Sequence, residues 1–271
     1  MREAVIVSTA RTPIGRAFKG AFNNTKSPTL LGHALRHAVQ RAAVDPAEIE
    51  DVVIGSCLTA GTAGLNIGRM GALAAGLGVT VPGQTIDRQC ASGLMAIATA
   101  AKQIISDGMT VVAAGGQENI SALNQPYAEW VSRERDVGLE ASVPQAYMPM
   151  LQTAEFVARK YGITREAQDD YALSSQRRTA AAQAAGRFDG EIVPMEATMK
   201  IVDRASGDVS YRDVTLAQDE GNRPETTLPD LSALKPVVEG GVVTAGNASQ
   251  LSDGASACIL MEARIAERRG L

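Results

Sequence analysis

The sequence predicts an α/β fold, with a mixed, mostly parallel sheet, layered helices and an inserted α+β loop subdomain. Three observations lead to this prediction. Up to Gly116, short apolar runs typical of buried strands alternate with helical patterns, as in βαβ units. Small residues are abundant, with 26 glycines, whereas aromatic residues make up only 4% of the chain, so that layers can approach closely. The alternation stops after Gly116 and returns near Gly240.

Before Gly116, most of the expected strands are short apolar runs, and the expected helices have an apolar stripe, a capping residue or a stretch without charged side chains. The expected strands are residues 4–8, 51–58, 84–86 and 110–114, and the expected helices are residues 28–43, 66–76 and 91–105. Asp45 is expected to cap a helical turn, and Pro46 after it suits the first helical position. Asn66 is expected to cap the second helix, which ends near Gly76.

After Gly116 the pattern becomes irregular, and residues 117–150 carry prolines, tyrosines and the single tryptophan. The elements expected beyond it are helices at 151–161 and 165–185, strands at 191–193 and 211–216 around a turn at 206–208, a return to α/β character at 240–244, a strand at 257–261 and a basic helix at 263–269. We therefore predict an amino-terminal α/β domain of residues 1–117 and 246–271, with residues 118–245 as the inserted subdomain.

The composition excludes several classes of protein. With 271 residues, of which 45% are hydrophobic and 21% charged, the chain can bury the core of one large or two modest domains. A net charge of −4 is not that of a basic nucleic-acid or membrane-surface protein. No apolar stretch reaches the roughly 20 residues of a membrane span, and the first residues lack the apolar core of a signal peptide. We expect a cytoplasmic protein with no nucleic-acid or membrane partner.

The three cysteines, Cys57, Cys90 and Cys258, are too few and too far apart for a disulfide scaffold, and none forms a C-x-x-C pair. Such usage is typical of a reducing compartment. We interpret Cys57 and Cys258 as small apolar residues inside strands. His33 and His37 lie four residues apart on an amphipathic helix without a His-Glu-x-x-His pattern, which indicates a solvated face and no metal site.

Cys90 differs because it follows a short strand and directly precedes a helix. From Ala91 to Ala101 no side chain is charged, and a helix that is apolar all round is expected to be buried on all sides. Amides and the macrodipole at its start favour thiolate over thiol, and the same amides can hold an oxyanion. By spacing alone a buried apolar cysteine is favoured. The polar residues directly before it, Asp87-Arg88-Gln89, nevertheless distinguish Cys90 from Cys57 and Cys258.

Four segments, in order and over the whole length of the chain, resemble those of the thiolase family. Asp87 to Leu94 resembles the nucleophilic-cysteine motif, and residues 243–255 resemble the second signature of the family. Residues 5–15 resemble its first strand and loop, and residues 114–121 resemble the Gly-Gly-x-Glu segment that leads into the CoA-binding loop domain. The Thr-Ala-Cys-Ser setting usual in related ketosynthases is absent from the sequence. The chain is thus similar to the amino-terminal half plus loop domain of a 3-ketoacyl-CoA thiolase or acetyl-CoA acetyltransferase.

The resemblance implies an acyltransferase of fatty acid metabolism. Cys90 would attack the keto carbon of a 3-ketoacyl-CoA, expel acetyl-CoA and hold an acyl-thioester that passes to free CoA. The reverse reaction makes acetoacetyl-CoA. CoA is then a substrate, and no separate cofactor is implied. Ser249 matches the serine that hydrogen-bonds pantetheine in thiolases. Arg223 aligns with an arginine near the nucleotide end of CoA, and a solvated surface arginine is an equally weighted alternative.

Two departures from the family pattern bear on substrate and completeness. Pro149 and Leu151 stand where biosynthetic thiolases often have histidine and glycine, and the Pro-Met pattern is more similar to degradative thiolases, so the acyl chain length stays open. The Asn-Glu-Ala-Phe, Gly-His-Pro and Cys-x-Gly-Gly segments, which supply an activating histidine and a second cysteine, are absent. We therefore expect residues 1–271 to be inactive alone, and to aggregate, form a homo-oligomer or pair with a missing carboxy-terminal half.

Two other functions stand beside this hypothesis. One is a non-catalytic, CoA-binding or partner-pairing half of a split or truncated thiolase. The other is a dinucleotide-binding protein, which is disfavoured because no Gly-x-Gly-x-x-Gly opens a helix after the first strand and no P-loop is present. A Gly-His-Pro and a Cys-x-Gly-Gly beyond Leu271 would decide in favour of a catalytic protein.

Overall fold

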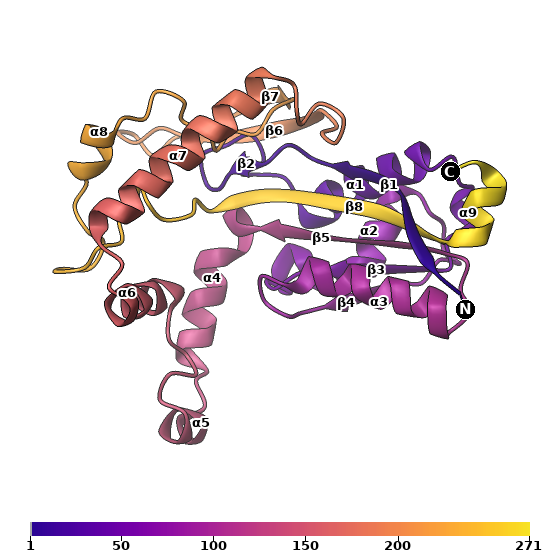
Figure 1. Ribbon diagram of the computed structural model, residues 1–271, viewed down its shortest axis with the longest axis horizontal. Coiled ribbons are helices and arrows are strands. Elements are labelled where there is room, and N and C mark those ends of the chain that lie inside the picture. The colour runs from indigo at the N-terminus through magenta and orange to yellow at the C-terminus, as the bar shows by residue number, and fades with distance from the viewer. Residues whose placement is uncertain (1) are drawn as a thin grey trace. The chain divides into compact units, whose positions relative to one another are not determined.

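A six-stranded mixed sheet forms the centre of the fold in the computed structural model, which describes residues 2–271 apart from the side chain of residue 124 (Figure 1). Its strands, in spatial order, are β1 (Ala4–Arg11), β8 (Ser252–Glu262), β5 (Val111–Asn119), β3 (Asp51–Gly55) and β4 (Gln84–Ile86), with β2 (Gly15–Arg16) paired to β8. β8 is antiparallel to β1, β2 and β5, whereas β3 is parallel to both β4 and β5. Every strand except β8 therefore runs in one direction, which confirms the mixed, mostly parallel sheet.

Helices cover both faces of the sheet because its strands alternate apolar side chains between two cores. Val52 of β3 lies in the core that contains α1 (Ser27–Arg41) and α2 (Ile67–Ala75). Val53 lies in the core that contains α3 (Ser92–Ser106). Since successive side chains of a strand point to opposite faces, α1 and α2 cover one face and α3 covers the other. The predicted layered α/β architecture is confirmed.

The other elements follow the central ones along the chain. They are α4 (Ile120–Arg133), α5 (Val137–Ser142), α6 (Met150–Tyr161), α7 (Arg165–Ala184), β6 (Met195–Val202), β7 (Val209–Leu216), α8 (Leu228–Ser232) and α9 (Ala263–Arg269), with short 3₁₀ turns at Pro46–Glu48 and Gly61–Ala63. The helices predicted at 151–161, 165–185 and 263–269 are confirmed. Among the residues described, no helix combines the length and apolar character needed to cross a bilayer.

Both predicted caps are present. The Asp45 side chain accepts from the Ala47 amide at 2.9 Å and forms a capping box with Glu48 at the start of a 3₁₀ turn. Asn66 accepts from the Arg69 amide at 3.3 Å and caps α2. These ends of the helices were predictable because capping residues act within three or four residues of their partners.

Three element predictions are wrong. Residues 117–150 contain the end of β5 and the helices α4 and α5, because a proline inside α4 hides its helical pattern. Residues 191–193 contribute only one bridge, between Ile192 and Arg11, and β6 starts later. Residues 240–244 contain no strand.

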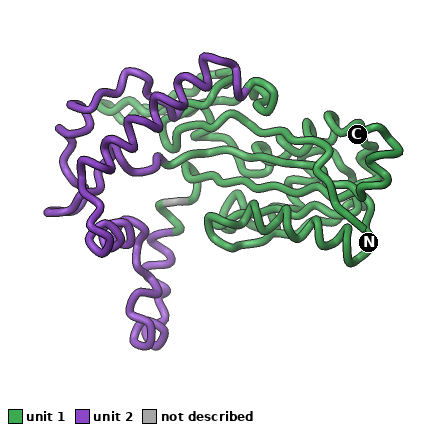
Figure 2. Tube along the Cα trace, in the orientation of Figure 1, with its two compact units in different colours: residues 1–127, 189–220, 251–271 green, residues 128–188, 221–250 purple. Residues whose placement is uncertain are grey.

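The described residues form two compact units, coloured separately in Figure 2. The first contains residues up to 127, residues 189–220 and residues 251–271, and the second contains residues 128–188 and 221–250. The antiparallel β6–β7 hairpin belongs to the first unit.

This division differs from the predicted domain boundaries, in which residues 118–245 form one insertion. The hairpin joins the first unit because its β6 end packs there: Met195 lies in the same core as α1. Asn23, in the loop before α1, adds two hydrogen bonds to the Lys200 backbone, at 2.8 and 2.9 Å. The two units are defined by contacts within this chain, so the predicted boundaries between an amino-terminal domain and a loop domain stay a prediction.

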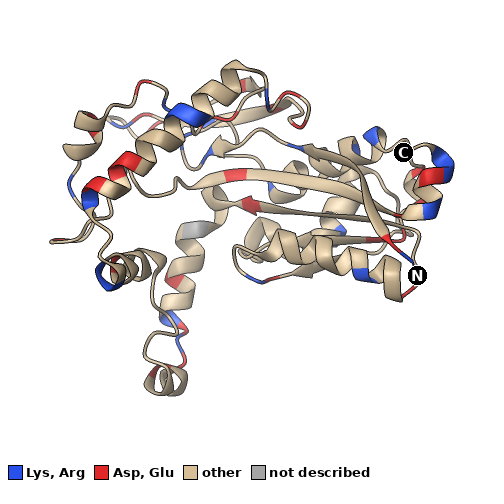
Figure 3. Ribbon diagram, viewed as in Figure 1, with Lys and Arg blue, Asp and Glu red and all other residues tan. Residues whose placement is uncertain are grey.

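Only one side of α3 is buried in the structure described here. Ser92, Ala96 and Ala100 are buried, whereas Leu94 is 73% exposed. Lys102 is the only charged residue of the helix, and Figure 3 shows the rest of its ribbon without charge. The prediction that this helix is buried on all sides is wrong for these residues, because a single layer of sheet covers only one side. The outer side of α3 is an apolar surface.

Candidate active site

The ends of three neighbouring parallel strands carry the side chains of the candidate site. β3 pairs with β4 on one side and with β5 on the other, and both pairings reach Gly55. Cys57 follows β3, Cys90 follows β4, and Glu118 lies near the end of β5. Since the sites of α/β proteins lie beyond the carboxyl ends of parallel strands, these three residues are candidates for the functional site.

Cys90 is exposed on a tight turn between β4 and α3. Gln89, directly before it, has a φ of 50°, a left-handed conformation that costs a residue with a β-carbon about 1–2 kcal/mol. Two side chains hold this turn. Asp87 Oδ1 accepts from the Gln89 amide at 2.8 Å. Ser92 Oγ accepts from the Arg88 amide at 2.8 Å and donates to Gln89 O at 2.5 Å. Side chains of the motif itself thus maintain the strained backbone that presents the thiol.

The helix that follows packs its first turn directly onto β3. α3 begins at Ser92, two residues after Cys90. A β-carbon built on Gly55 would lie 2.2 Å from the carbonyl carbon of Ser92 and 2.4 Å from the amide nitrogen of Gly93, so only glycine permits this approach. Cys90 therefore stands beside the amide end of a 15-residue helix, where partial positive charge gathers. That this end stabilises the Cys90 thiolate stays a prediction.

The Cys57 thiol is bound to a carboxylate. Cys57 Sγ donates to Glu118 Oε2 at 2.8 Å. The amides of Cys57 and Leu58 donate to the same carboxylate at 2.9 and 3.2 Å. Burial, together with the Glu118 carboxylate, raises the pKa of Cys57 to about 12. Cys57 is therefore held as a thiol at neutral pH.

The interpretation of Cys57 as an apolar residue inside a strand is wrong. β3 ends at Gly55, and Cys57 is half-buried in the loop beyond it. The available signal was the glutamate of the Gly-Gly-x-Glu segment, but it lies 61 residues away in the chain. The same interpretation of Cys258 is confirmed: it is buried in β8, and burial raises its pKa to about 11.

The predicted CoA-binding residues, Arg223 and Ser249, are exposed and lie in the second unit, whereas Cys90 belongs to the first. The loops that carry them are neighbours, since a β-carbon built on Gly221 would lie 2.6 Å from Gln250 Nε2. The side-chain oxygen of Gln176 in α7 accepts from the Arg223 amide at 2.8 Å. Ser249 Oγ donates to Gln250 O at 3.2 Å. The structure thus brings these two loops together within one unit.

Two buried carboxylates hold the segment 242–247, which leads to one of these loops. Glu155 of α6 is 4% exposed and accepts from the first two amides of the segment at 2.8–3.1 Å. Asp169 of α7 is 1% exposed and accepts from Asn247 Nδ2 at 3.0 Å and from Arg165 Nε at 2.8 Å. Sequence reasoning assigned neither carboxylate a role, because each is separated from the segment by more than 70 residues.

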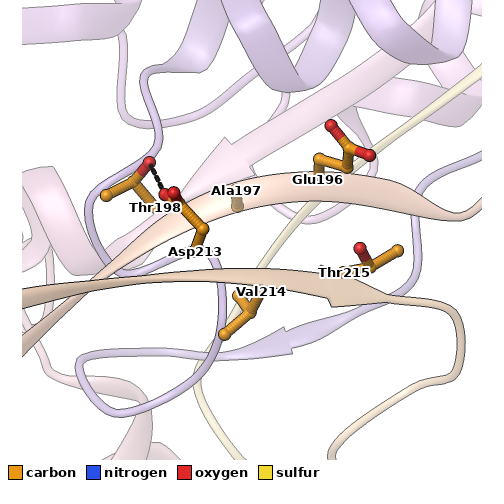
Figure 4. A pocket seen from close by; sticks show the side chains of 6 residues that line it. All are labelled: Glu196, Ala197, Thr198, Asp213, Val214 and Thr215. Carbon is orange, nitrogen blue, oxygen red and sulfur yellow. Dashed lines mark hydrogen bonds between the residues drawn. The ribbon is translucent and has the colours of Figure 1, made fainter.

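Two cavities of the first unit have linings that do not include Cys90. One, of about 520 Å³, lies on the β6–β7 hairpin, where Thr198 Oγ1 donates to Asp213 Oδ1 at 2.8 Å (Figure 4). The other, of about 510 Å³, is lined in part by His33 and His37. Burial lowers the pKa of both imidazoles. Within the described residues, no group of three or more histidine, cysteine or acidic side chains is arranged to hold a metal ion.

Comparisons with known proteins place these features in a family. The family described as "Thiolase, N-terminal domain" matches residues 4–264. The 3-ketoacyl-CoA thiolase of Bacillus subtilis is 42% identical over 273 residues, which cover 100% of this chain and 68% of that protein. The peroxisomal 3-ketoacyl-CoA thiolase 2 of Arabidopsis thaliana is 38% identical over 270 residues, which cover 99% of this chain and 57% of that protein.

A solved structure agrees with these sequence matches. The crystal structure of the Bacillus anthracis acetyl-CoA acetyltransferase superposes with a TM-score of 0.82 at 38% identity, covering 100% of this chain and 68% of that one. The chain thus spans between 57% and 68% of the length of these three relatives. The match over nearly all of its residues, with the layered fold and the four motifs in order, means that the chain belongs to the thiolase family of acyltransferases.

Proposed function

We propose that the protein transfers acyl groups between CoA thioesters through an acyl-thioester on Cys90. It cleaves 3-ketoacyl-CoA with CoA or, in reverse, condenses two acetyl-CoA molecules to acetoacetyl-CoA. The observation that carries this proposal is the exposed Cys90 on a strained turn at the start of α3. The printed names of the relatives, 3-ketoacyl-CoA thiolase and acetyl-CoA acetyltransferase, support the same chemistry.

Cys90 acts as the nucleophile. Its thiolate sulfur attacks the keto carbon of the substrate and forms a tetrahedral alkoxide. Collapse of the alkoxide breaks the carbon–carbon bond, releases the enolate of acetyl-CoA and leaves the acyl group on sulfur. Amides at the start of α3 are suited to stabilise negative charge that forms beside the sulfur. The enolate must also be stabilised and protonated, and the family resemblance assigns that step to segments that this sequence does not contain.

The second unit binds CoA in this proposal. Ser249 donates a hydrogen bond to the pantetheine, and the Arg223 guanidinium pairs with phosphates at the nucleotide end. The support is that both side chains are exposed on neighbouring loops. The buried Glu155 and Asp169 hold the segment leading to Ser249 in place before any ligand arrives, which lowers the entropic cost of binding.

A second candidate function is a CoA-binding or partner-pairing half without catalysis. The apolar outer side of α3, with Leu94 73% exposed, favours this alternative. Apolar surfaces of this kind typically meet a protein partner, here a second copy of the chain or the carboxy-terminal half of a thiolase.

Further proposals concern the setting. We place the protein in the cytoplasm as a homo-oligomer, within fatty acid metabolism, with CoA as a substrate and no separate cofactor. The support for a reducing compartment is the cysteine usage, since three widely spaced cysteines without a C-x-x-C pair do not form a disulfide scaffold. Cell fractionation tests the location, and recovery in peroxisomes or in the medium would contradict it.

The acyl-enzyme is tested by running only the half-reaction in which acetyl-CoA acetylates the protein. The protein is incubated with acetyl-CoA, digested at acid pH and mapped by mass spectrometry. We expect one acetyl group on Cys90, which hydroxylamine removes, and no acetylation in Cys90→Ser. Cys258→Ser is the matched control, since it removes a thiol from the core and should leave the acetylation intact. Binding of CoA without acetylation of Cys90 would favour the second candidate, and acetylation equal at Cys57 and Cys90 would contradict the first.

A further inference from the structure

Two of the three cysteines lie at the same end of the sheet. Cys57 follows β3 and Cys90 follows β4, and these strands are hydrogen-bonded neighbours up to the Ser56 amide, which donates to Ile86 O at 3.1 Å. Cys258 lies inside β8 and is buried. The topology therefore separates a pair of thiols from a single core thiol.

The segments that carry the pair are in direct contact. β3 and the first turn of α3 touch at Gly55 and Ser92, and each cysteine is two residues from that contact. Burial and the Glu118 carboxylate contribute most to the raised pKa of Cys57, and Asp87 and Cys90, on the turn after β4, add smaller contributions.

We propose that Cys57 is the resolving thiol for Cys90: when a hydroperoxide oxidises Cys90, Cys57 closes a reversible Cys57–Cys90 disulfide. The proposal rests on the proposed function only in taking Cys90 as the reactive thiol, and it requires no turnover. It assigns a covalent modification site to a residue outside the nucleophile motif.

The two thiols are suited to different steps. Cys90 is exposed, so it meets the oxidant first. Cys57 is half-buried and protonated, and protonated thiols react poorly with peroxides, so it survives the first step. Glu118 Oε2 lies 2.8 Å from its sulfur and can accept its proton when a sulfenic acid forms nearby.

The chemistry balances with one hydroperoxide. The Cys90 thiolate attacks the O–O bond, gains one oxygen as sulfenic acid and releases an alcohol, or water if the oxidant is hydrogen peroxide. The Cys57 sulfur then attacks the Cys90 sulfur, so the S–S bond forms and the S–O bond breaks. The hydroxide that leaves takes the Cys57 proton by way of Glu118 and becomes water. Two thiols lose two electrons, and the peroxide gains them.

The disulfide protects Cys90 from further oxidation and at the same time stops its acyl transfer. In the disulfide, Cys90 has no free thiolate and cannot accept an acyl group. It is also removed from further oxidation to sulfinic acid, which thiol reductants do not reverse. A thiol reductant restores both cysteines.

The experiment compares the wild-type chain, Cys57→Ser and Cys258→Ser after a small molar excess of hydrogen peroxide. Free thiols are blocked, and non-reducing digests are mapped by mass spectrometry. Cys57→Ser is a fair variant because serine keeps a donor for Glu118, and circular dichroism checks its fold. We expect a Cys57–Cys90 linked peptide in the wild type and in Cys258→Ser, with iodoacetamide labelling of Cys90 restored by dithiothreitol. In Cys57→Ser we expect sulfinic acid on Cys90 and at least a fivefold lower recovery.

Other outcomes overturn the proposal. These are equal recovery in wild type and Cys57→Ser, sulfinic acid on Cys90 in the wild type without a linked peptide, or disulfides only between two chains on non-reducing gels. Acetylation of Cys90 in the reduced protein is measured in parallel. Loss of the linkage with acetylation intact contradicts this inference alone, whereas a linkage without acetylation contradicts only the proposed function.

Discussion

The loop after β3 and the turn after β4 carry one cysteine each, yet the protein treats the two thiols in opposite ways. Cys57 is half-buried and bound to Glu118, a residue of another strand. Cys90 is exposed on a turn fixed by Asp87 and Ser92, which belong to its own motif. One thiol is kept protonated by a distant partner, and the other is presented to solvent by local ones.

The difference teaches where reactivity comes from at this end of the sheet. Neither strand makes a cysteine reactive by itself. A carboxylate beside a thiol opposes its ionisation, because two negative charges would be forced together. A helix start and an open surface favour attack by sulfur. Selectivity between the two thiols thus depends on Glu118 and on the turn at Gln89, and both can be altered separately.

The largest expected effect is in alkylation. At pH 8 a thiol with a pKa of about 12, such as Cys57, is ionised in only about one molecule in ten thousand. We expect iodoacetamide to label Cys90 on the order of 10²-fold faster than Cys57 or Cys258 in the folded protein. Peptide mapping over time measures this, with urea-unfolded protein as the control in which all three label at similar rates. Equal or slower labelling of Cys90 would contradict the view that Cys90 is the reactive thiol and Cys57 the protected one.

The second effect is the dependence of Cys57 on Glu118. In Glu118→Gln the carboxylate charge is lost, so the pKa of Cys57 should fall towards that of an ordinary thiol and its labelling at pH 9 should rise about tenfold. Labelling of Cys90 should change much less. Glu166→Gln, at an exposed position of α7, is the control. Unchanged labelling of Cys57 in Glu118→Gln would mean that burial alone sets its reactivity.

The same pair predicts a loss of stability in alkali. The pKa of Cys57 is raised in the folded protein, to about 12, so the native state binds its proton more tightly than the unfolded state does. Its contribution to stability is complete below the unfolded pKa, about 8.5, and is lost as the pH rises towards 12. Urea melts at pH 8 and pH 10 should show a smaller loss in Cys57→Ser than in wild type. A loss as large in Cys57→Ser would assign the effect to other groups.

The two cysteine regions also separate what was predictable from what was not. The turn at Cys90 was predictable because Asp87, Ser92 and the helix they introduce lie within a few residues of one another. Caps and most central strands were predictable for the same local reason. The Cys57–Glu118 pair was not, since its members meet only when β3 and β5 pair.

The second unit repeats this lesson. The motif containing Ser249 was identifiable from residues next to one another, but its supports, Glu155 and Asp169, come from helices far away in the chain. The one-sided burial of α3 was likewise not readable from its uniformly apolar sequence, because composition does not say how many layers cover a helix. The β6–β7 hairpin was assigned to the insertion because it lies within residues 118–245 of the chain, whereas its packing places it in the first unit.

A smaller effect is expected from the turn itself. Ser92→Ala removes the acceptor for the Arg88 amide and the donor to Gln89 O, at a cost of about 1–2 kcal/mol in free energy of unfolding. Cys90 should then lose part of its advantage in labelling, since the turn is no longer held. Ser106→Ala, at the exposed far end of α3, is the control and should cost less than about 0.5 kcal/mol. A cost in Ser92→Ala no greater than in the control would show that the turn does not depend on this serine.

The smallest effect, and the sharpest test of strain, is Gln89→Gly. Glycine relieves about 1–2 kcal/mol of left-handed strain but adds about 0.5–1 kcal/mol of backbone entropy to the unfolded state. The exposed Gln89 side chain contributes little to packing, so the free energy of unfolding should rise by about 0–1.5 kcal/mol. Gln89→Ala is the matched control, because it removes the side chain and keeps the strain, and it should be neutral. If glycine at this position stabilises the protein while acetylation of Cys90 slows, the strain serves to hold the thiol in its reactive position. If glycine destabilises the protein by more than alanine does, the turn at Cys90 is not strained, and the contrast with Cys57 lies in charge and exposure.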